Sequence, residues 1–277
     1  MKKAIISFAA AVLACSFAFG FAACGGAEES GGNATQGSGG SYDDSGDTDA
    51  GGNSNTGGGS AAPVGDIATA AQWKLAFADT VASKNIGIEF VLKSGGTTYK
   101  SEYLIDYAGG KAYTKSESVA GGSTQTKREE VYTVAVGGSV KKYTYSEYYY
   151  TGEYYWSVQT QDYGAAEEAI AQIRTQYPLS QILPVSYEYA ATAGSATVKG
   201  KIEDLFAAFV YDSSSDTYSA KLTQNPGTEW AETETYKISF KDGKVYKISW
   251  GGATLTLDYG EVSIEVPREA LDADHGT

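Results

Sequence analysis

Residues 236–250 read YKISFKDGKVYKISW. Ile238 and Phe240 alternate with polar residues before an Asp-Gly pair, and Ile248 and Trp250 do so after it. A period of two places alternate side chains on one face of a strand. Asp-Gly supplies the positive φ angles that a two-residue hairpin turn requires. The stretch therefore predicts an antiparallel hairpin with one apolar face.

Similar alternations flank this hairpin on both sides. Between residues 88 and 160 they are broken by double glycines, which predicts an antiparallel meander. A further hairpin is expected over residues 211–218, and two more strands over residues 253–259 and 262–266, where Pro267 ends the pattern.

Three segments have helical spacing instead. Trp73 and Phe77 lie on one stripe of residues 67–83, residues 166–177 repeat apolar side chains up to a proline, and residues 202–209 form a shorter stripe. The sequence therefore predicts an α+β domain with a leading helix, two inserted helices and about ten antiparallel strands.

The N-terminus has the features of a secretory signal. Lys2 and Lys3 precede a stretch without charge that ends in small residues before Cys24. The sequence Phe21-Ala22-Ala23-Cys24 resembles the lipobox of bacterial lipoproteins, although Phe21 replaces the usual Leu. That resemblance implies cleavage before Cys24 and a lipid on its thiol. Cleavage before Cys15, or an ordinary signal with an incidental cysteine, are the alternatives.

The chain is therefore expected to have three parts. Residues 1–23 are a lipoprotein signal peptide, and residues 24–62 are the lipidated cysteine and a tether. The tether has one aromatic residue and no Leu, Ile or Val, so it should be disordered. Residues 63–277 are one domain with a short disordered C-terminal tail. The expected location is extracytoplasmic, lipid-anchored to the membrane at the cell surface or the periplasmic face.

Composition excludes several kinds of chemistry. The only cysteines are Cys15 and Cys24, and the only histidine is His275, so disulfides, thiol nucleophiles, imidazole catalysis and Cys or His metal sites are not expected. Adjacent carboxylates such as Glu129 and Glu130 should face opposite sides of a strand, unlike a glycosidase pair. We therefore expect no enzyme, no metal and no cofactor.

Charge limits the partners. Loss of the signal removes two lysines and no acid, so the formal charge changes from −13 to −15. An acidic surface repels nucleic acid and anionic lipid, so the lipid anchor must provide the membrane attachment. The protein is expected to be a monomer.

The order of elements resembles the lipoprotein carriers and lipid-binding lipoproteins of the LolA and LppX type. The similar phrases are residues 209–220, residues 238–244, and Leu257-Asp258-Tyr259-Gly260 followed by residues 264–267. The resemblance spans residues 67–267. It implies an open half β-barrel, with the helices on its concave face and acyl chains held between them.

The residues expected to line that lipid cavity are apolar side chains of the leading helix and of four strands. They are Trp73, Phe77, Phe90, Leu92, Ile238, Phe240, Ile248, Trp250, Leu255 and Leu257. A closed core under the helices would give the same pattern.

Tyrosine supports a different hypothesis. The chain has 22 tyrosines, and they cluster within residues 143–155, next to Trp156. Consecutive aromatic residues on a strand must point to both faces, and rings with polar tips suit sugar stacking or protein contact. A glycan-binding or adhesive module is therefore the alternative, unless the tyrosines are there only because they form strands well.

Overall fold

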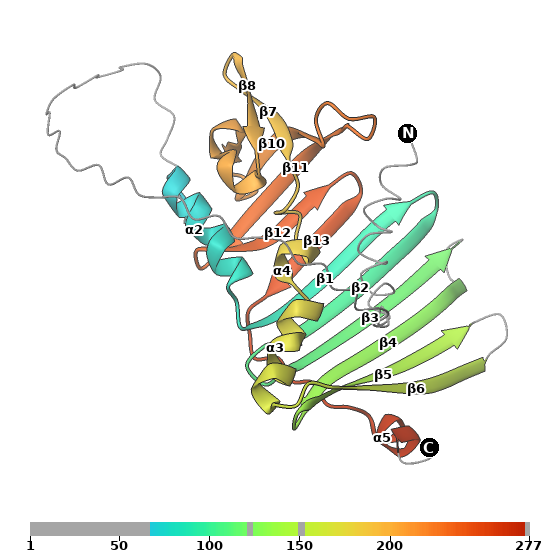
Figure 1. Cartoon of the computed structure of the whole chain (residues 1–277). Helices are drawn as coiled ribbons and strands as arrows, with labels where there is room; N and C mark the ends of the chain where they lie inside the picture. Colours follow the sequence, from blue (N-terminus) through green and yellow to red (C-terminus); the bar gives the residue numbers. More distant parts are fainter. Residues whose placement is uncertain (1–66, 121–123, 149–152, 275–277) are drawn as a thin grey trace, which may run out of the picture. The chain divides into compact units, whose positions relative to one another are not determined.

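The computed structural model describes residues 67–120, 124–148 and 153–274. The predicted signal segment, Cys24, the tether, Tyr149 and His275 lie outside these ranges. Thirteen strands form one open, curved, antiparallel sheet accompanied by a few helices (Figure 1). The α+β class is confirmed, whereas the expectation of about ten strands was too low.

The first six strands form a meander, as the double glycines predicted. They are β1 (Asn85–Ser94), β2 (Thr97–Asp106), β3 (Lys111–Ala120), β4 (Thr124–Val136), β5 (Ser139–Tyr148) and β6 (Glu153–Asp162).

The remaining strands form the other half of the sheet. They are β7 (Tyr189–Ala193), β8 (Ala196–Gly200), β9 (Val210–Asp212), β10 (Thr217–Gln224), β11 (Glu232–Lys241), β12 (Lys244–Trp250) and β13 (Ala253–Asp258).

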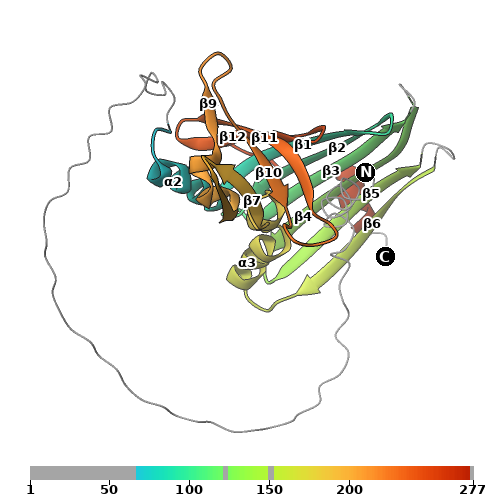
Figure 2. The same ribbon diagram turned by 90° about the horizontal axis from the view of Figure 1, so that it is seen from above.

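The two halves meet where the first strand pairs with the last. The order across the sheet is β6-β5-β4-β3-β2-β1-β13-β12-β11-β10-β7-β8, and β9 pairs with β10 beside this path. In the join, Ile88 lies opposite Leu257 and Phe90 opposite Leu255. Figure 2 shows the resulting curved sheet from above. This non-local pairing leaves β6 and β8 as the two ends of the path.

The leading helix is α2 (Ala70–Val81). Thr69 caps it, because its hydroxyl accepts the Gln72 amide proton while the Gln72 side chain accepts the Thr69 amide proton. Helices α3 (Ala166–Gln176) and α4 (Leu179–Ile182) follow β6. Helix α2 packs against β12, and α3 against β3, β4 and β5.

Helices α2 and α3 cover the same side of the sheet, here named the helix face. Strand pairing places Ile86, Ile105 and Thr133 on one face, and the Thr133 hydroxyl lies 2.7 Å from the Tyr177 hydroxyl at the end of α3. Ile86 and Ile105 belong to the same apolar cluster as Trp73 of α2. Residues one position away along each strand point to the opposite side, here named the outer face.

Three predictions of local structure were wrong. Residues 202–209 form two 3₁₀ turns, η1 (Ile202–Asp204) and η2 (Phe206–Ala208), in place of a helix. Residues 262–266 form no strand, because β13 is already paired on both sides, by β1 and β12. The expected disordered tail contains helix α5 (Arg268–Asp274).

Helix α5 has a clear physical origin. Pro267 lies at its start, where its carbonyl accepts the amides of Ala270 and Leu271. Ala270 is fully buried in a small cluster with Val134 and Tyr143 of the outer face. In the described part of the chain, no helix is long and apolar enough to cross a membrane.

Candidate functional site

The ten predicted lining residues lie together in one apolar cluster between the helices and the sheet. Nine of them are 9% exposed or less, and Phe240 is partly buried. The sequence therefore identified a set of side chains that share one region. Their role as a lipid cavity remains a prediction.

Trp73 is closely surrounded by aromatic rings. Its ring centroid lies 5.4 Å from that of Phe77, 4.7 Å from that of Phe209 and 5.1 Å from that of Phe240. Its indole N–H donates to the Ile202 carbonyl at 3.1 Å. The space beside α2 is thus occupied by side chains, some of them from the 3₁₀ turns, which the sequence analysis did not assign to the lining.

A second aromatic group fills the region around Trp250. Its ring stacks on Tyr236, with an interplanar angle of 1° and centroids 5.7 Å apart. Tyr236 in turn meets Tyr189 edge-on at 5.4 Å. These contacts are those of a packed core.

The outer face has a different chemistry. Strand pairing from β1 to β6 aligns one row of side chains across this face, and most of them are polar or aromatic. The row is Glu89, Glu102, Lys115, Glu130, Tyr145 and Trp156. Five of these six side chains can form hydrogen bonds or ion pairs outside the core, and Trp156 can donate one through its indole N–H.

Five rings form a connected group on this face, here named the aromatic array: Tyr113, Tyr132, Tyr145, Tyr154 and Trp156. Successive centroids are 4.8 Å apart for Tyr113 and Tyr132, 6.2 Å for Tyr132 and Trp156, 5.2 Å for Trp156 and Tyr145, and 6.0 Å for Tyr145 and Tyr154. Tyr154 is 68% exposed, and the other four are partly buried.

Charged side chains hold the array in place. Arg128 Nε donates to Glu130 Oε1 at 2.8 Å, and the guanidinium lies 5.8 Å from the centre of the Tyr145 ring. The Tyr132 hydroxyl donates to Glu130 Oε2 at 3.2 Å, and the Tyr145 hydroxyl to Glu147 Oε2 at 3.3 Å. Burial, reinforced by Glu130, raises the pKa of Tyr132 to about 12, so this phenol stays a neutral donor near neutral pH.

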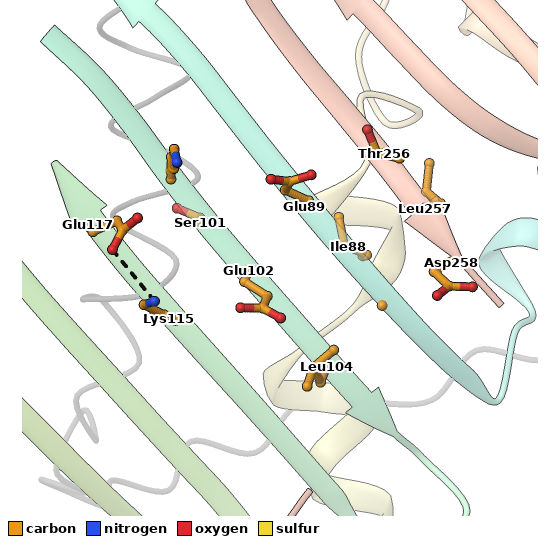
Figure 3. A pocket seen from close by; sticks show the side chains of 12 residues that line it. Ile88, Glu89, Ser101, Glu102, Leu104, Lys115, Glu117, Thr256, Leu257 and Asp258 are labelled. Carbon is orange, nitrogen blue, oxygen red and sulfur yellow. Dashed lines mark ion pairs between the residues drawn. The ribbon is translucent and has the colours of Figure 1, made fainter. Parts of the chain in front are cut away.

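A hollow bordered by charged side chains adjoins the array on β13, β1, β2 and β3 (Figure 3). Its volume is about 450 Å³. Gly87 lies in its floor, where a methyl group would come within 3.5 Å of Leu104 and 3.6 Å of Asp258. The charged side chains around it are Glu89, Glu102, Glu117, Asp258, Lys100 and Lys115.

The hollow has an excess of negative charge. Lys115 pairs with Glu117 at 3.6 Å, whereas Glu89 and Glu102 lie directly opposite each other on neighbouring strands. Like charges in that position destabilise a sheet. The arrangement would therefore favour ligands with hydrogen-bond donors over anions.

Sequence reasoning found only part of this surface. It singled out Trp156 and the tyrosines near it, and Tyr149 lies outside the described residues. It missed Tyr113, Tyr132 and the charged row, because only the strand register aligns residues from six strands. The expectation that Glu129 and Glu130 face opposite sides of the strand is confirmed. Glu130 lies opposite Tyr145 on the outer face, and Glu129 lies opposite Ser146 on the helix face.

No protein-family model matches the sequence, and no curated protein matches it significantly. The likeness to LolA and LppX proteins therefore remains a prediction. Among the described residues, no group of three or more His, Cys, Asp or Glu side chains is placed to hold a metal ion.

Proposed function

We propose that the chain is a non-enzymatic, lipid-anchored extracytoplasmic protein that binds glycan chains on its outer face. The observation that supports this proposal is the aromatic array with its bordering carboxylates and arginine. In the region expected to hold lipid, aromatic rings pack around Trp73 and Trp250.

The chemistry of the array suits sugars. The C–H faces of a pyranose ring pack on aromatic rings, while its hydroxyls need donors and acceptors at the ring edges. Arg128 and Glu147, whose side chains are 39% and 37% exposed, provide a donor and an acceptor beside the array. The net negative charge of the hollow disfavours acidic polysaccharides, so neutral or amino sugars are the expected class.

The test measures binding of soluble oligomers of glucose and of N-acetylglucosamine by calorimetry. Tyr154→Ala and Trp156→Ala should each weaken binding about tenfold, which corresponds to about 1.4 kcal/mol. Trp230→Ala is the matched control, because this tryptophan is 52% exposed in the connection between β10 and β11, outside the array. Equal losses in all three variants, or no binding of either oligomer, would contradict the proposal.

A lipid ligand remains the second candidate function. The feature that favours it is the continuity of the apolar cluster, which brings residues of α2 together with residues of β1, β11, β12 and β13. A lipid carrier would need to open this cluster, and the Leu257 substitution described in the Discussion tests for that capacity.

A further inference from the structure

The two ends of the sheet differ in how well they are protected. Strand β8 is five residues long, contains Lys199 and ends in a glycine. Strand β6 is ten residues long, reads EYYWSVQTQD, and has no lysine, arginine, proline or glycine. It pairs with β5 from Glu153 to Asp162 without a register shift.

An edge strand exposes unpaired backbone N–H and C=O groups on one side. Proteins normally protect such edges with lysine, proline, bulges or short strands. β8 has two of these features and β6 has none. In the part of the chain that the structure describes, β6 pairs with β5 alone and ends the sheet (Figure 1).

Among the described residues, helix α5 forms no backbone hydrogen bond with the outer edge of β6. It packs on the outer face, where Ala270 joins a cluster with Val158 and Trp156. Among the described residues, its amides bond back to Pro267, and none bonds to β6. Alternate residues of β6 therefore present their backbone groups outward.

We propose that β6 is a strand-addition site that takes an extended, basic segment of another protein. Backbone hydrogen bonds would give affinity, as in other cases where a peptide extends a sheet. The basic character follows from charge. β6 carries Glu153 and Asp162 and no base, and the whole chain has a formal charge of −13.

A second copy of this chain fits the edge less well. Antiparallel self-pairing of β6 in full register places Glu153 opposite Asp162 at both ends. Like charges in directly opposite positions are destabilising, and two strongly acidic protomers repel each other at longer range. A basic partner would instead place opposite charges at the ends of β6, and it would be attracted to the acidic chain at longer range.

The side chains of β6 would add specificity. Tyr154 is 68% exposed and Tyr155 is 51% exposed, on opposite faces of the strand. A lysine or arginine placed opposite Tyr154 would lie near its ring, in the kind of contact that Arg128 already makes with Tyr145. This inference does not rest on glycan binding, because it depends on the strand edge and not on the face.

The experiment uses the full-length chain in detergent and three blocked synthetic peptides. The first is KVTVTVTK, the second is its acidic twin EVTVTVTE, and the third is KVTVTVTK with alternate backbone nitrogens methylated. Calorimetry should show saturable binding of the first, at least about tenfold weaker binding of the second, and none of the third. Hydrogen exchange should show that peptide binding protects the amides of β6.

Paired variants locate the site. Ser157→Lys with Gln159→Lys should abolish binding of KVTVTVTK, since lysines protect an edge. Ala196→Lys with Thr197→Lys adds the same charge to β8 and should leave binding nearly unchanged. Equal binding of the methylated peptide, or no change in β6 exchange, would overturn the proposal. The proposal would also be overturned if the unchanged chain forms a dimer that the Ser157→Lys, Gln159→Lys variant does not form. In that case the strand added to β6 would come from a second copy of this chain.

Discussion

At the scale of single residues, Tyr259 has a structural role in the fold. Its hydroxyl donates to the Val245 carbonyl at 2.6 Å and lies 3.0 Å from the Thr80 hydroxyl. Thr80 is fully buried, donates to the Ala76 carbonyl at 2.7 Å, and accepts the Val245 amide at 3.3 Å. The Asp-Tyr-Gly phrase that supported the family resemblance therefore connects the end of β13 to β12 and α2.

Tyr259→Phe should lower the free energy of unfolding by about 1 kcal/mol at neutral pH, because the Val245 carbonyl loses a donor. Burial raises the pKa of Tyr259 to about 12. An unfolded tyrosine ionises near pH 10, so between about pH 10 and 12 the unfolded state releases a proton that the folded state keeps. This contribution to stability is complete below about pH 10 and is lost as the pH rises to about 12.

Denaturant unfolding from pH 8 to pH 12 measures both effects. Tyr259→Phe should make the alkaline decline of stability shallower than in the unchanged chain. Tyr154→Phe is the control, because Tyr154 is 68% exposed and its substitution should leave the stability at neutral pH unchanged. An equally steep decline in both variants would show that Tyr259 titrates as it does in the unfolded chain.

At the scale of elements, β13 is the strand on which the lipid hypothesis depends. Leu257 is 1% exposed and lies opposite Ile88, which is also 1% exposed. We expect Leu257→Trp to overpack this region and lower the free energy of unfolding by about 1–3 kcal/mol, whereas Leu257→Met should change it by less than about 1.5 kcal/mol. Thermal and denaturant unfolding with both variants measure this difference.

The opposite result would favour a lipid carrier. Suppose that the unchanged chain binds a fluorescent fatty acid, and that Leu257→Trp does not bind it but keeps the same stability. The apolar cluster must then contain a cavity that the tryptophan side chain fills. If the unchanged chain binds no fatty acid and Leu257→Trp is destabilised, the cluster is a closed core.

The elements also show how far sequence reasoning extends. Local signals predicted the β11–β12 hairpin and the meander. Asp242-Gly243 and Gly95-Gly96 take positive φ angles at both positions, and Gly110 and Gly137 supply one each in two further turns. The β7–β8 hairpin was missed, since its five-residue strands are rich in alanine and glycine, which are weak strand formers. The β1–β13 pairing is non-local, so no sequence window contains the information that joins the two halves of the sheet.

At the scale of the whole molecule, the domain has one face buried under helices and one face with an aromatic and charged surface. The outer face can bind a large ligand only where that ligand is present, so the proposed glycan function depends on the location of the protein. In the proposed function, that location depends in turn on the sulfur of Cys24, which lies outside the described residues.

Cys24→Ser should release the protein from membranes, because the hydroxyl cannot replace the thiol as acceptor of the lipid that the lipobox resemblance implies. The anchor binds the membrane through its acyl chains, and each buried methylene contributes about 0.8 kcal/mol. Without the anchor only the acidic domain remains, and it should have no affinity for anionic lipid. Cell fractionation and metabolic labelling with palmitate measure the result: label and membrane association should both disappear. Cys15→Ser is the matched control and should keep both. If Cys24→Ser still takes up label while Cys15→Ser does not, cleavage before Cys15 is the correct assignment. If neither variant nor the unchanged chain is labelled, the protein is secreted without an anchor. Its outer face must then meet its ligand away from the membrane.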